Sequence, residues 1–208
     1  MMGRRKSAAQ SPMVSTRGDA KKPAPSRRLP RAPHRASLIV STPWGWMGIA
    51  ETARGIAMIL LPGRSKAAVA KGLRAAPGGP GTAASSARLG AARKQLTEYL
   101  AGSRTRFDLP LDLSGGTDFQ RRVWKALRAV PYGELRSYRE LAALVGGKQY
   151  ARAVGNAVGA NPLPIVIPCH RIVSGDATIG GFSGGLPTKR KLLALENSLS
   201  RLRRKGRE

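Results

Sequence analysis

The chain has 208 residues, enough for one medium-sized domain or two small ones. Its 37 Lys and Arg residues outnumber 11 Asp and Glu, and the formal net charge of +26 favours polyanionic partners such as nucleic acid or an anionic membrane surface. One cysteine excludes an intramolecular disulfide, and two histidines are too few for a Cys/His metal cluster. No run approaches the roughly 18 apolar residues of a membrane span, and no hydrophobic signal segment follows the basic N-terminus. We therefore expect no metal, no membrane association and an intracellular, reducing setting.

Both ends of the chain are basic. Residues 1–36 carry ten basic residues and one acidic residue with few large apolar side chains, so we expect a disordered tail. The last twelve residues, NSLSRLRRKGRE, carry five basic residues and one acidic residue, and we expect a second tail over 198–208. The chain between, 37–196, still has 22 basic and 9 acidic residues, so the folded part is basic as well.

Residues 37–112 predict a small α/β domain. Two short apolar runs, ASLIVST and GIAMILLPG, flank the glycine-bearing segment WGWMGIAETARG. This pattern predicts a small β meander. A loop rich in Gly, Pro and Ala, APGGPGTAASS, and one helix, LGAARKQLTEYLAG, are expected to follow it.

Residues 113–197 predict a second domain that is mainly helical. Thr117 stands three residues before Gln120, which is the spacing of a capping box at a helix N-terminus. Apolar residues then recur at helical intervals, and Pro131 is expected to end the helix.

The same device recurs in SYRELAALVGG, where Ser137 precedes Glu140 and the pair Gly146-Gly147 ends the pattern. A third helix is expected from Tyr150 to about residue 160. Two short helices joined by a glycine-bearing turn form a candidate helix-turn-helix, a motif that binds DNA.

The expected third helix, ARAVGNAVGA, consists almost wholly of Ala, Gly and Val, with Arg152 as its one charge. Glycine inside a helix costs about 1 kcal/mol relative to alanine, so two glycines require a reason. Close packing against another helix would supply one, and close approach of the helix to a nucleic-acid groove would supply another. The two are compatible, because opposite faces of one helix can serve each.

Cys169 lies in the segment NPLPIVIPCHRIV. A lone cysteine in an apolar run is usually a small buried hydrophobe. Here Pro168 precedes it, His170 and Arg171 follow it, and the molecule is electropositive, conditions that lower a thiol pKa and favour the nucleophilic thiolate. A cysteine protease fits badly, because the only other histidine, His34, falls in the expected tail and no acyl-transfer signature is present.

The segment NPLPIVIPCHRIV, preceded by SYRELAALVG and RAVGNAVGAN and followed by GGFSGG and KLLALE, closely resembles the O6-alkylguanine-DNA alkyltransferases. The resemblance is dense over 117–196. The amino-terminal part matches loosely, through WGWMGIAETARGIAMILLP, and its size suits the family's small α/β domain.

This resemblance implies an α/β (α+β) fold, no cofactor and a direct-reversal DNA repair protein. Such a protein would bind double-stranded DNA through the minor groove with its helix-turn-helix and flip the alkylated guanine out of the stack. We expect a monomer in the cytoplasm, associated with the nucleoid in a bacterium, or in the nucleus of a eukaryote. Some relatives hold zinc in the amino-terminal domain, but this chain lacks the ligands.

The resemblance also implies roles for individual residues. Cys169 would take the alkyl group from O6-alkylguanine, with O4-alkylthymine as a second candidate lesion, and would do so irreversibly and once. His170 would act as its base through a bridging water, oriented by Glu196. Asn161 would brace the turn before the cysteine. Tyr138 would contact the flipped guanine and help to protonate the departing base.

On the DNA side, Arg152 would fill the gap left by the flipped nucleotide, beside a low-profile face formed by Ala151, Ala153 and Gly155. The guanine pocket would be lined by Ile172, Phe182 and Ser183.

Phe182 and Arg171 both follow Cys169 in the chain. Phe182 stands where many relatives carry tyrosine, so aromatic packing on the alkyl group is kept, while the hydrogen bonding of this loop and the range of substrates are in question. Arg171 is assigned to structure, as one member of a salt bridge whose partner the sequence does not reveal.

Two other classes of protein remain open. An alkyltransferase-like protein binds lesions without transferring the group, although such relatives lack the reactive cysteine that Cys169 would supply. A helix-turn-helix regulator or architectural protein would carry the cysteine incidentally. Irreversible labelling of Cys169 by alkylated DNA separates the alkyltransferase from both.

Overall fold

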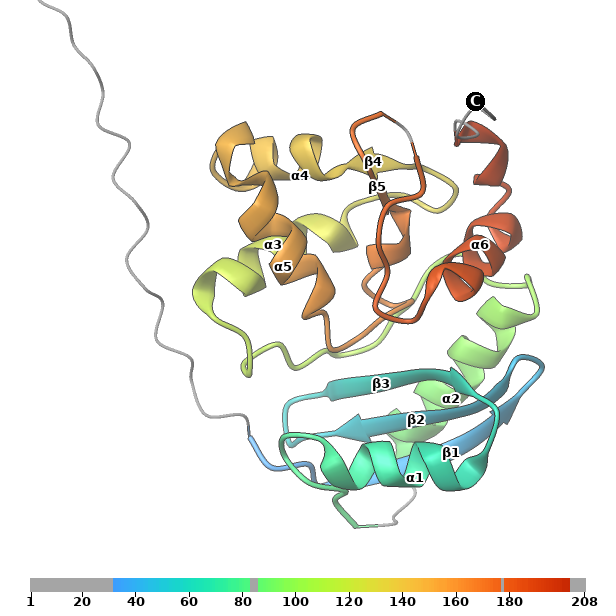
Figure 1. The fold of residues 1–208 in the computed structure, drawn as a ribbon. Helices are drawn as coiled ribbons and strands as arrows, with labels where there is room; N and C mark the ends of the chain where they lie inside the picture. Colours follow the sequence, from blue (N-terminus) through green and yellow to red (C-terminus); the bar gives the residue numbers. More distant parts are fainter. Residues whose placement is uncertain (1–31, 83–85, 177, 203–208) are drawn as a thin grey trace, which may run out of the picture.

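A three-stranded antiparallel sheet in the order β1-β2-β3 forms the first layer of the molecule (Figure 1). The computed structural model describes residues 32–82, 86–176 and 178–202. The strands are β1 (Ala36–Thr42), β2 (Gly45–Glu51) and β3 (Ile56–Gly63). These are the apolar runs that predict a β meander, and the prediction is confirmed.

The two faces of this sheet are distinguished by the register of the strands. Leu38 pairs with Ile49 and Ile49 with Ile59, so this row of apolar side chains shares one face. The adjacent row, with Gly48 between β1 and β3, lies on the other face. The Leu38 row packs into the main core, and the Gly48 row belongs to a smaller cluster.

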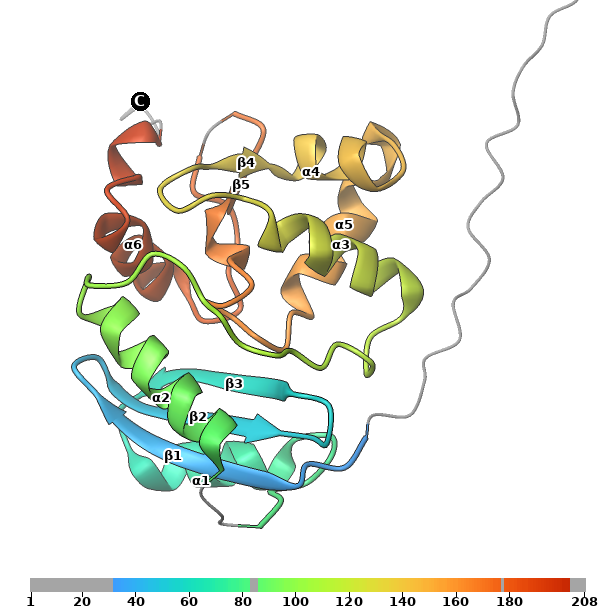
Figure 2. The same ribbon diagram turned by 180° about the vertical axis from the view of Figure 1, so that it is seen from behind.

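Two helices cover opposite faces of the sheet, α1 (Lys66–Ala75) and α2 (Ala87–Leu100) (Figures 1 and 2). Val69 and Leu73 of α1 pack over Gly48 of β2. A Cβ added to this glycine would lie 3.0 Å from Val69 Cγ1. The α2 helix confirms the helix predicted from LGAARKQLTEYLAG. The α1 helix was not predicted, because its alanine-rich sequence has only two large apolar residues to mark a helical period.

The second part of the molecule is mainly helical, and its first two predicted helices are confirmed with their capping boxes at Thr117 and Ser137. The turn between α4 and α5 uses Gly146 and Gly147 at φ 153° and 135°, which suit glycine. The long elements are α3 (Asp118–Arg128), α4 (Tyr138–Val145), α5 (Ala151–Gly159) and α6 (Leu186–Leu195).

Two short strands and three 3-10 turns complete the described part of this domain. The strands β4 (Arg136–Ser137) and β5 (Ile172–Val173) pair in parallel. Short 3-10 turns span Lys148–Tyr150, Cys169–Arg171 and Leu199–Arg201.

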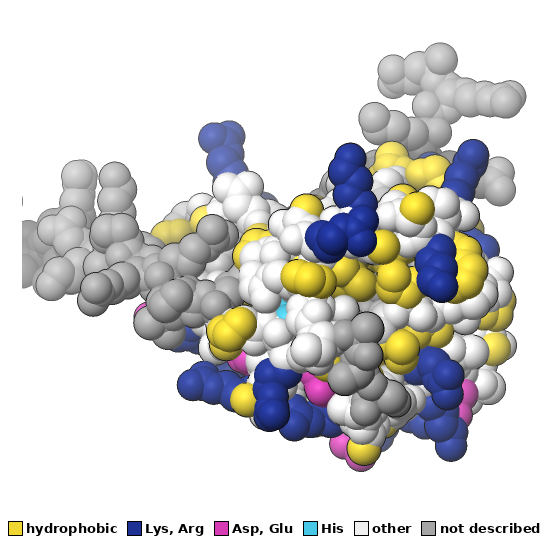
Figure 3. Space-filling view, turned by 90° about the horizontal axis from the view of Figure 1, so that it is seen from below, with side chains coloured by type: hydrophobic (Ala, Val, Ile, Leu, Met, Phe, Trp, Pro, Cys, Tyr) yellow, Lys and Arg dark blue, Asp and Glu magenta, His cyan; other side chains and the backbone are white. Residues whose placement is uncertain are grey.

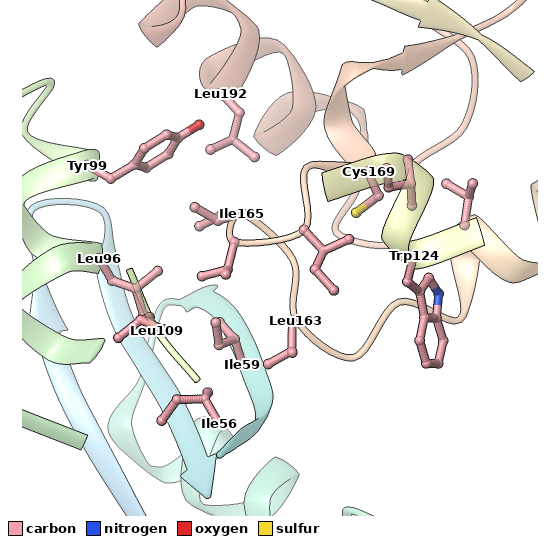
Figure 4. Close-up of a cluster of buried hydrophobic side chains, with 14 of the residues drawn as sticks. Ile56, Ile59, Leu96, Tyr99, Leu109, Trp124, Leu163, Ile165, Cys169 and Leu192 are labelled. Atoms are coloured by element: carbon pink, nitrogen blue, oxygen red, sulfur yellow. The ribbon is translucent and has the colours of Figure 1, made fainter. Parts of the chain in front are cut away.

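One hydrophobic core joins the sheet to the helical part. Figure 4 shows Ile59 and Leu96 from the sheet domain facing Leu163 and Ile165 of the segment that leads to Cys169. The backbone N–H of Ile59 also donates to the carbonyl of Pro162, at 2.9 Å. The apolar run before the cysteine is therefore the layer on which the two parts of the molecule meet.

Part of each expected tail packs against the folded chain. His34, assigned to the amino-terminal tail, is buried, and its Nδ1 lies 2.6 Å from the carbonyl oxygen of Gly79. Ser198, assigned to the carboxy-terminal tail, is buried and donates to the carbonyl of Leu193. The assignment of these two residues to the tails was wrong, since the His34 contact is made across 45 residues and composition shows no such pairing. The rest of both tails, 1–31 and 203–208, lies outside the described residues.

Within the described ranges, no helix combines the length and the apolar character that crossing a bilayer requires.

We predict that Trp124→Phe lowers the free energy of unfolding by about 2–4 kcal/mol, because it removes buried volume and leaves a buried carbonyl without its donor. The Trp124 side chain is 1% exposed, and its Nε1 donates to the carbonyl of Ala157 near the end of α5, at 2.8 Å. Equilibrium urea unfolding measures the change. Trp44→Phe is the matched control, a half-buried tryptophan expected to cost under about 1 kcal/mol, and equal losses in both variants would contradict this assignment.

Candidate active site

Cys169 begins the 3-10 turn Cys169–Arg171 and is 3% exposed. The side chain of Asn161 holds the segment before it, because Nδ2 donates to the carbonyl of Ile167 at 2.8 Å and Oδ1 accepts from the N–H of Leu163 at 3.0 Å. The same Nδ2 lies 3.1 Å from the sulfur of Cys169. The geometry thus joins Asn161 to the turn before the cysteine and to the thiol itself.

Ile165, in the middle of this segment, has φ 76° and is 1% exposed. The left-handed region is unfavourable for a β-branched residue and persists only where the surroundings enforce it. Here the enforcing contacts are the core on one side and the Asn161 bonds on the other. The backbone before the cysteine is therefore held in a single, strained conformation.

Burial raises the pKa of the Cys169 thiol, and the hydrogen bond from Asn161 and the charge of Lys189 oppose this effect only in part. The expectation that basic surroundings lower this pKa was wrong. Basic residues that are close in sequence do not set the pKa of Cys169, because the low dielectric around a buried sulfur disfavours the thiolate. The resting group is a thiol, so a base is needed to activate it.

The candidate base, His170, is fully buried and points Nε2 at Oε1 of Glu196, 3.0 Å away. Burial lowers the pKa of His170, although Glu196 opposes the change, so the ring is neutral at pH 7. With Nε2 donating to the carboxylate, Nδ1 is left buried without a hydrogen-bond partner in the described structure. This nitrogen is free to accept a proton.

Glu196 is the shared acceptor of the site. Arg171 donates to it through Nε at 2.9 Å and Nη2 at 2.8 Å, and through Nη1 to the carbonyl of Val130 at 2.6 Å. Burial alone would raise the pKa of Glu196, but the hydrogen bonds from His170 and Arg171, with the charge of Arg171, outweigh it and lower the pKa to about 2. The predicted salt bridge of Arg171 is confirmed, and its partner is Glu196.

Tyr99 enters the site from α2, in the sheet domain. Its hydroxyl donates to Oε1 of Glu196 at 2.5 Å and lies 3.3 Å from Nε2 of His170. Burial, with the neighbouring carboxylate, raises its pKa, so it remains a neutral donor. Sequence reasoning missed this residue, because an aromatic side chain on the apolar face of a helix has no feature that separates it from an ordinary core residue.

The sulfur borders a cavity of about 200 Å³ between the helix-turn-helix and the loop after β5. Tyr138, half-buried at the start of α4, lies on one side with its hydroxyl 3.5 Å from the carbonyl of Gly181. Burial raises the pKa of Tyr138, as does a charge on Cys169, so its hydroxyl stays protonated. The lining residues are Tyr138, Gly155, Val158, Gly159, Cys169, Gly181, Phe182 and Ser183.

The structure thus brings Phe182, Ser183, Tyr138 and Gly155 to the cysteine. Ile172 is placed elsewhere, fully buried and outside this lining, with its carbonyl accepting from Lys189 Nζ at 2.5 Å.

Lys189 is a second residue that sequence reasoning missed. It is fully buried, and Nζ also donates to the carbonyls of Ile179 at 2.5 Å and Gly181 at 3.1 Å. Burial lowers its pKa to about 8. The lysine ties the loop at the cavity mouth to the strand after the cysteine, and in the sequence it cannot be told from its basic neighbours in TKRK.

The α5 helix separates two surfaces. Val154, Ala157 and Val158 are buried against the core, whereas Arg152 and Ala153 are exposed and Ala151 is partly exposed. The small residues therefore serve packing on one face and give a low outer surface on the other. Arg152 projects from that outer surface, and no ion pair is formed by it in the part of the chain that is described.

Comparison with known proteins agrees over both parts of the molecule. The model of the 6-O-methylguanine DNA methyltransferase ribonuclease-like domain matches residues 37–113, and that of the DNA binding domain matches residues 118–198. The methylated-DNA–protein-cysteine methyltransferase of Mycobacterium tuberculosis is 54% identical over 104 residues, 50% of this chain and 62% of the relative. The constitutive Bacillus subtilis relative is 49% identical over 96 residues, 46% of this chain and 58% of its own length.

These matches to curated relatives span about three fifths of the relatives' length. The similarity to solved structures covers a larger share of both chains. The crystal structure of Mycobacterium tuberculosis OGT in complex with DNA has a TM-score of 0.65 and 38% identity, covering 79% of this chain and 94% of that one. Both the cysteine segment and the sheet domain packed against it are thus shared, and the chain belongs to the 6-O-methylguanine DNA methyltransferase family.

Proposed function

We propose that this protein repairs DNA by direct reversal, transferring the alkyl group of O6-alkylguanine to Cys169. The observation that carries the proposal is the sulfur at the end of a cavity that opens between the helix-turn-helix and the loop of Phe182 and Ser183. His170, the next residue in the chain, is buried and paired with Glu196, and it supplies a base. The names of the relatives, methylated-DNA–protein-cysteine methyltransferases, support the same reaction.

The transfer is a single displacement. The Cys169 thiol passes its proton through one bridging water to Nδ1 of His170, the nitrogen that is free of other partners. The sulfur forms a bond to the alkyl carbon as the carbon–oxygen bond breaks, and the bonding electrons remain on the guanine. Tyr138 donates its hydroxyl proton to the departing guanine and is reprotonated from water.

The surrounding groups keep each partner in its working state. Glu196 fixes the tautomer of His170 and stabilises the imidazolium that forms. Arg171 and Tyr99 hold this carboxylate charged and oriented. The product is a thioether, a poor leaving group, so the protein is consumed stoichiometrically and acts as a methylated-DNA–[protein]-cysteine S-methyltransferase without turnover.

DNA binding is assigned to the α4–α5 helix-turn-helix, because the cavity opens beside it. The low outer surface of α5, with Ala151, Ala153 and Gly155, suits close approach to a minor groove, and Arg152 would occupy the gap left by the flipped nucleotide. A related structure is a complex with DNA, which supports this assignment. We propose that the protein acts as a monomer in the compartment that holds the DNA.

The first experiment mixes the protein with a short duplex that contains one O6-methylguanine, followed by peptide mass analysis. We expect one methyl group on the Cys169 peptide, saturating at one per protein. Cys169→Ala should bind the lesion and take up no methyl group. Lesion binding without transfer by the wild type would move the protein to the lesion-sensing class, and the absence of any lesion preference would leave a helix-turn-helix protein of another kind.

Arg152→Ala tests base flipping. We expect transfer from duplex DNA to slow about tenfold or more, since the cost of an unfilled stack is a few kcal/mol, while reaction with the free O6-methylguanine base is unchanged. Single-turnover kinetics with both substrates measure this. Arg139→Ala removes an exposed charge from α4 of the same motif and should weaken binding without this selectivity. Equal losses with DNA and free base would argue against the assignment.

Tyr99→Phe tests the contribution of the sheet domain to the site. Loss of the hydrogen bond to a carboxylate should cost about 1–3 kcal/mol of stability and slow transfer, because Glu196 loses one of the groups that orient it. Without the donor from Tyr99, the Glu196 carboxylate interacts more strongly with His170 and raises the pKa of that histidine. The acid limb of the pH–rate profile should therefore move to higher pH. Tyr132→Phe is the control, because its hydroxyl donates to the carbonyl of Leu195 instead. An unmoved pH profile in Tyr99→Phe would show that Tyr99 is only structural.

A further inference from the structure

The sheet domain contains a long stretch of one charge sign. Between Glu51 and Glu98 the sequence has no Asp or Glu. The same 46 residues, 52–97, include eight basic residues: Arg54, Arg64, Lys66, Lys71, Arg74, Arg88, Arg93 and Lys94. The candidate active site uses this stretch only through the packing of β3 and α2, which does not involve these basic side chains, so their charge requires another explanation.

The α1 helix displays part of this charge on one side. Lys66, Lys71 and Arg74 are exposed, while Val69 and Leu73 are buried against the sheet. The residues between the three cations are Ala and Gly on the exposed side. The outer surface of α1 is therefore basic and low, without bulky side chains that would hold a partner away.

These cations have no carboxylate partner among the described residues, whereas Arg88, Arg104, Arg121 and Arg136 each lie beside an acid. The ammonium of Lys66 lies 5.7 Å from the ring centre of Trp46, a cation–π contact that supplies no formal counter-charge. A cluster of like charges without counter-charges raises the free energy of the folded state. An external polyanion would relieve this repulsion.

The α1 surface points away from the helix-turn-helix. The α1 helix covers the sheet face of the Gly48 row, and the opposite face, with Ile49 and Ile59, packs on α2 and the helical domain. Figure 1 accordingly shows α1 and the α4–α5 pair at opposite ends of the molecule. Figure 3, which views the α1 end, shows more Lys and Arg than acidic side chains around this face.

We propose that the outer surface of α1 binds the phosphate backbone of a second DNA segment while α4–α5 holds the first. Lys66 and Arg74 are eight residues apart, about 12 Å along the helix axis, which spans about three phosphates of one strand at 3.4 Å each. Such binding is weak, independent of sequence and sensitive to salt. It lets the protein pass from one segment to another in its search for a lesion.

This inference rests on the proposed DNA binding by α4–α5 and not on the chemistry of Cys169. The test therefore measures bridging and methyl transfer separately. A biotinylated duplex containing O6-methylguanine is immobilised and loaded with the full-length Cys169→Ala variant, and retention of a free fluorescent duplex is recorded at rising salt. The same substitutions in the wild-type background are assayed for methyl transfer to a short duplex in solution.

Lys66→Gln/Lys71→Gln/Arg74→Gln keeps good helix formers in α1 and removes three charges. We expect retention of the second duplex to fall at least tenfold and its salt dependence to lose about three units of slope, while methyl transfer is unchanged. Arg93→Gln/Lys94→Gln/Arg106→Gln removes the same charge from exposed positions outside α1 and should retain the duplex almost as the parent does.

Other outcomes overturn the proposal. Absence of a retained second duplex with intact lesion binding and transfer would exclude bridging while leaving the repair function in place. Equal losses in the two triple variants would show an effect of net charge alone. Retention unaffected by the α1 substitutions would assign bridging to another part of the chain. Capture of anionic lipid vesicles but not of the second duplex would identify a membrane as the partner instead.

Discussion

The carboxylate of Glu196 is the point on which the site depends. A buried carboxylate is costly unless its lone pairs are satisfied. Here donors converge from α2, through Tyr99, from the turn after α3, through the N–H of Gly133, and from His170 and Arg171 beside the cysteine. Because the donors come from three separate segments, α2, the turn after α3 and the 3-10 turn Cys169–Arg171, the charge can be buried only when both parts of the molecule are docked. The contacts that stabilise the buried carboxylate are therefore the same contacts that assemble the site.

This arrangement explains how a deeply buried cysteine can be a reagent. Burial raises the pKa of the Cys169 thiol, which protects it from indiscriminate reaction, and it also lowers the pKa of His170, which keeps the base unprotonated. Both effects come from the same low-dielectric surroundings. For the proposed reaction, the site therefore holds a protonated nucleophile and an unprotonated base beside the cavity.

The sheet domain contributes directly to the candidate site, although it lies apart from the helix-turn-helix. It supplies Tyr99 to the carboxylate, and its Ile59 packs and hydrogen-bonds against the strained segment that precedes the cysteine. Its other face carries α1, whose cations lie outside the chemistry altogether. One face of a small sheet therefore supports the candidate site, while the other is covered by α1, whose outer surface is exposed.

The features that depend on local pattern were predictable from the amino-acid sequence: the β meander, the capping boxes at Thr117 and Ser137, the helix-turn-helix and the cysteine segment. The partner of Arg171, the contribution of Tyr99 and the burial of His34 were not predictable, because each arises between residues 25 to 97 positions apart. The pKa of Cys169 is the clearest case. Neighbours in sequence suggested a lowered value, whereas burial, which only the tertiary structure creates, raises it, because desolvation of the thiolate outweighs the nearby charges.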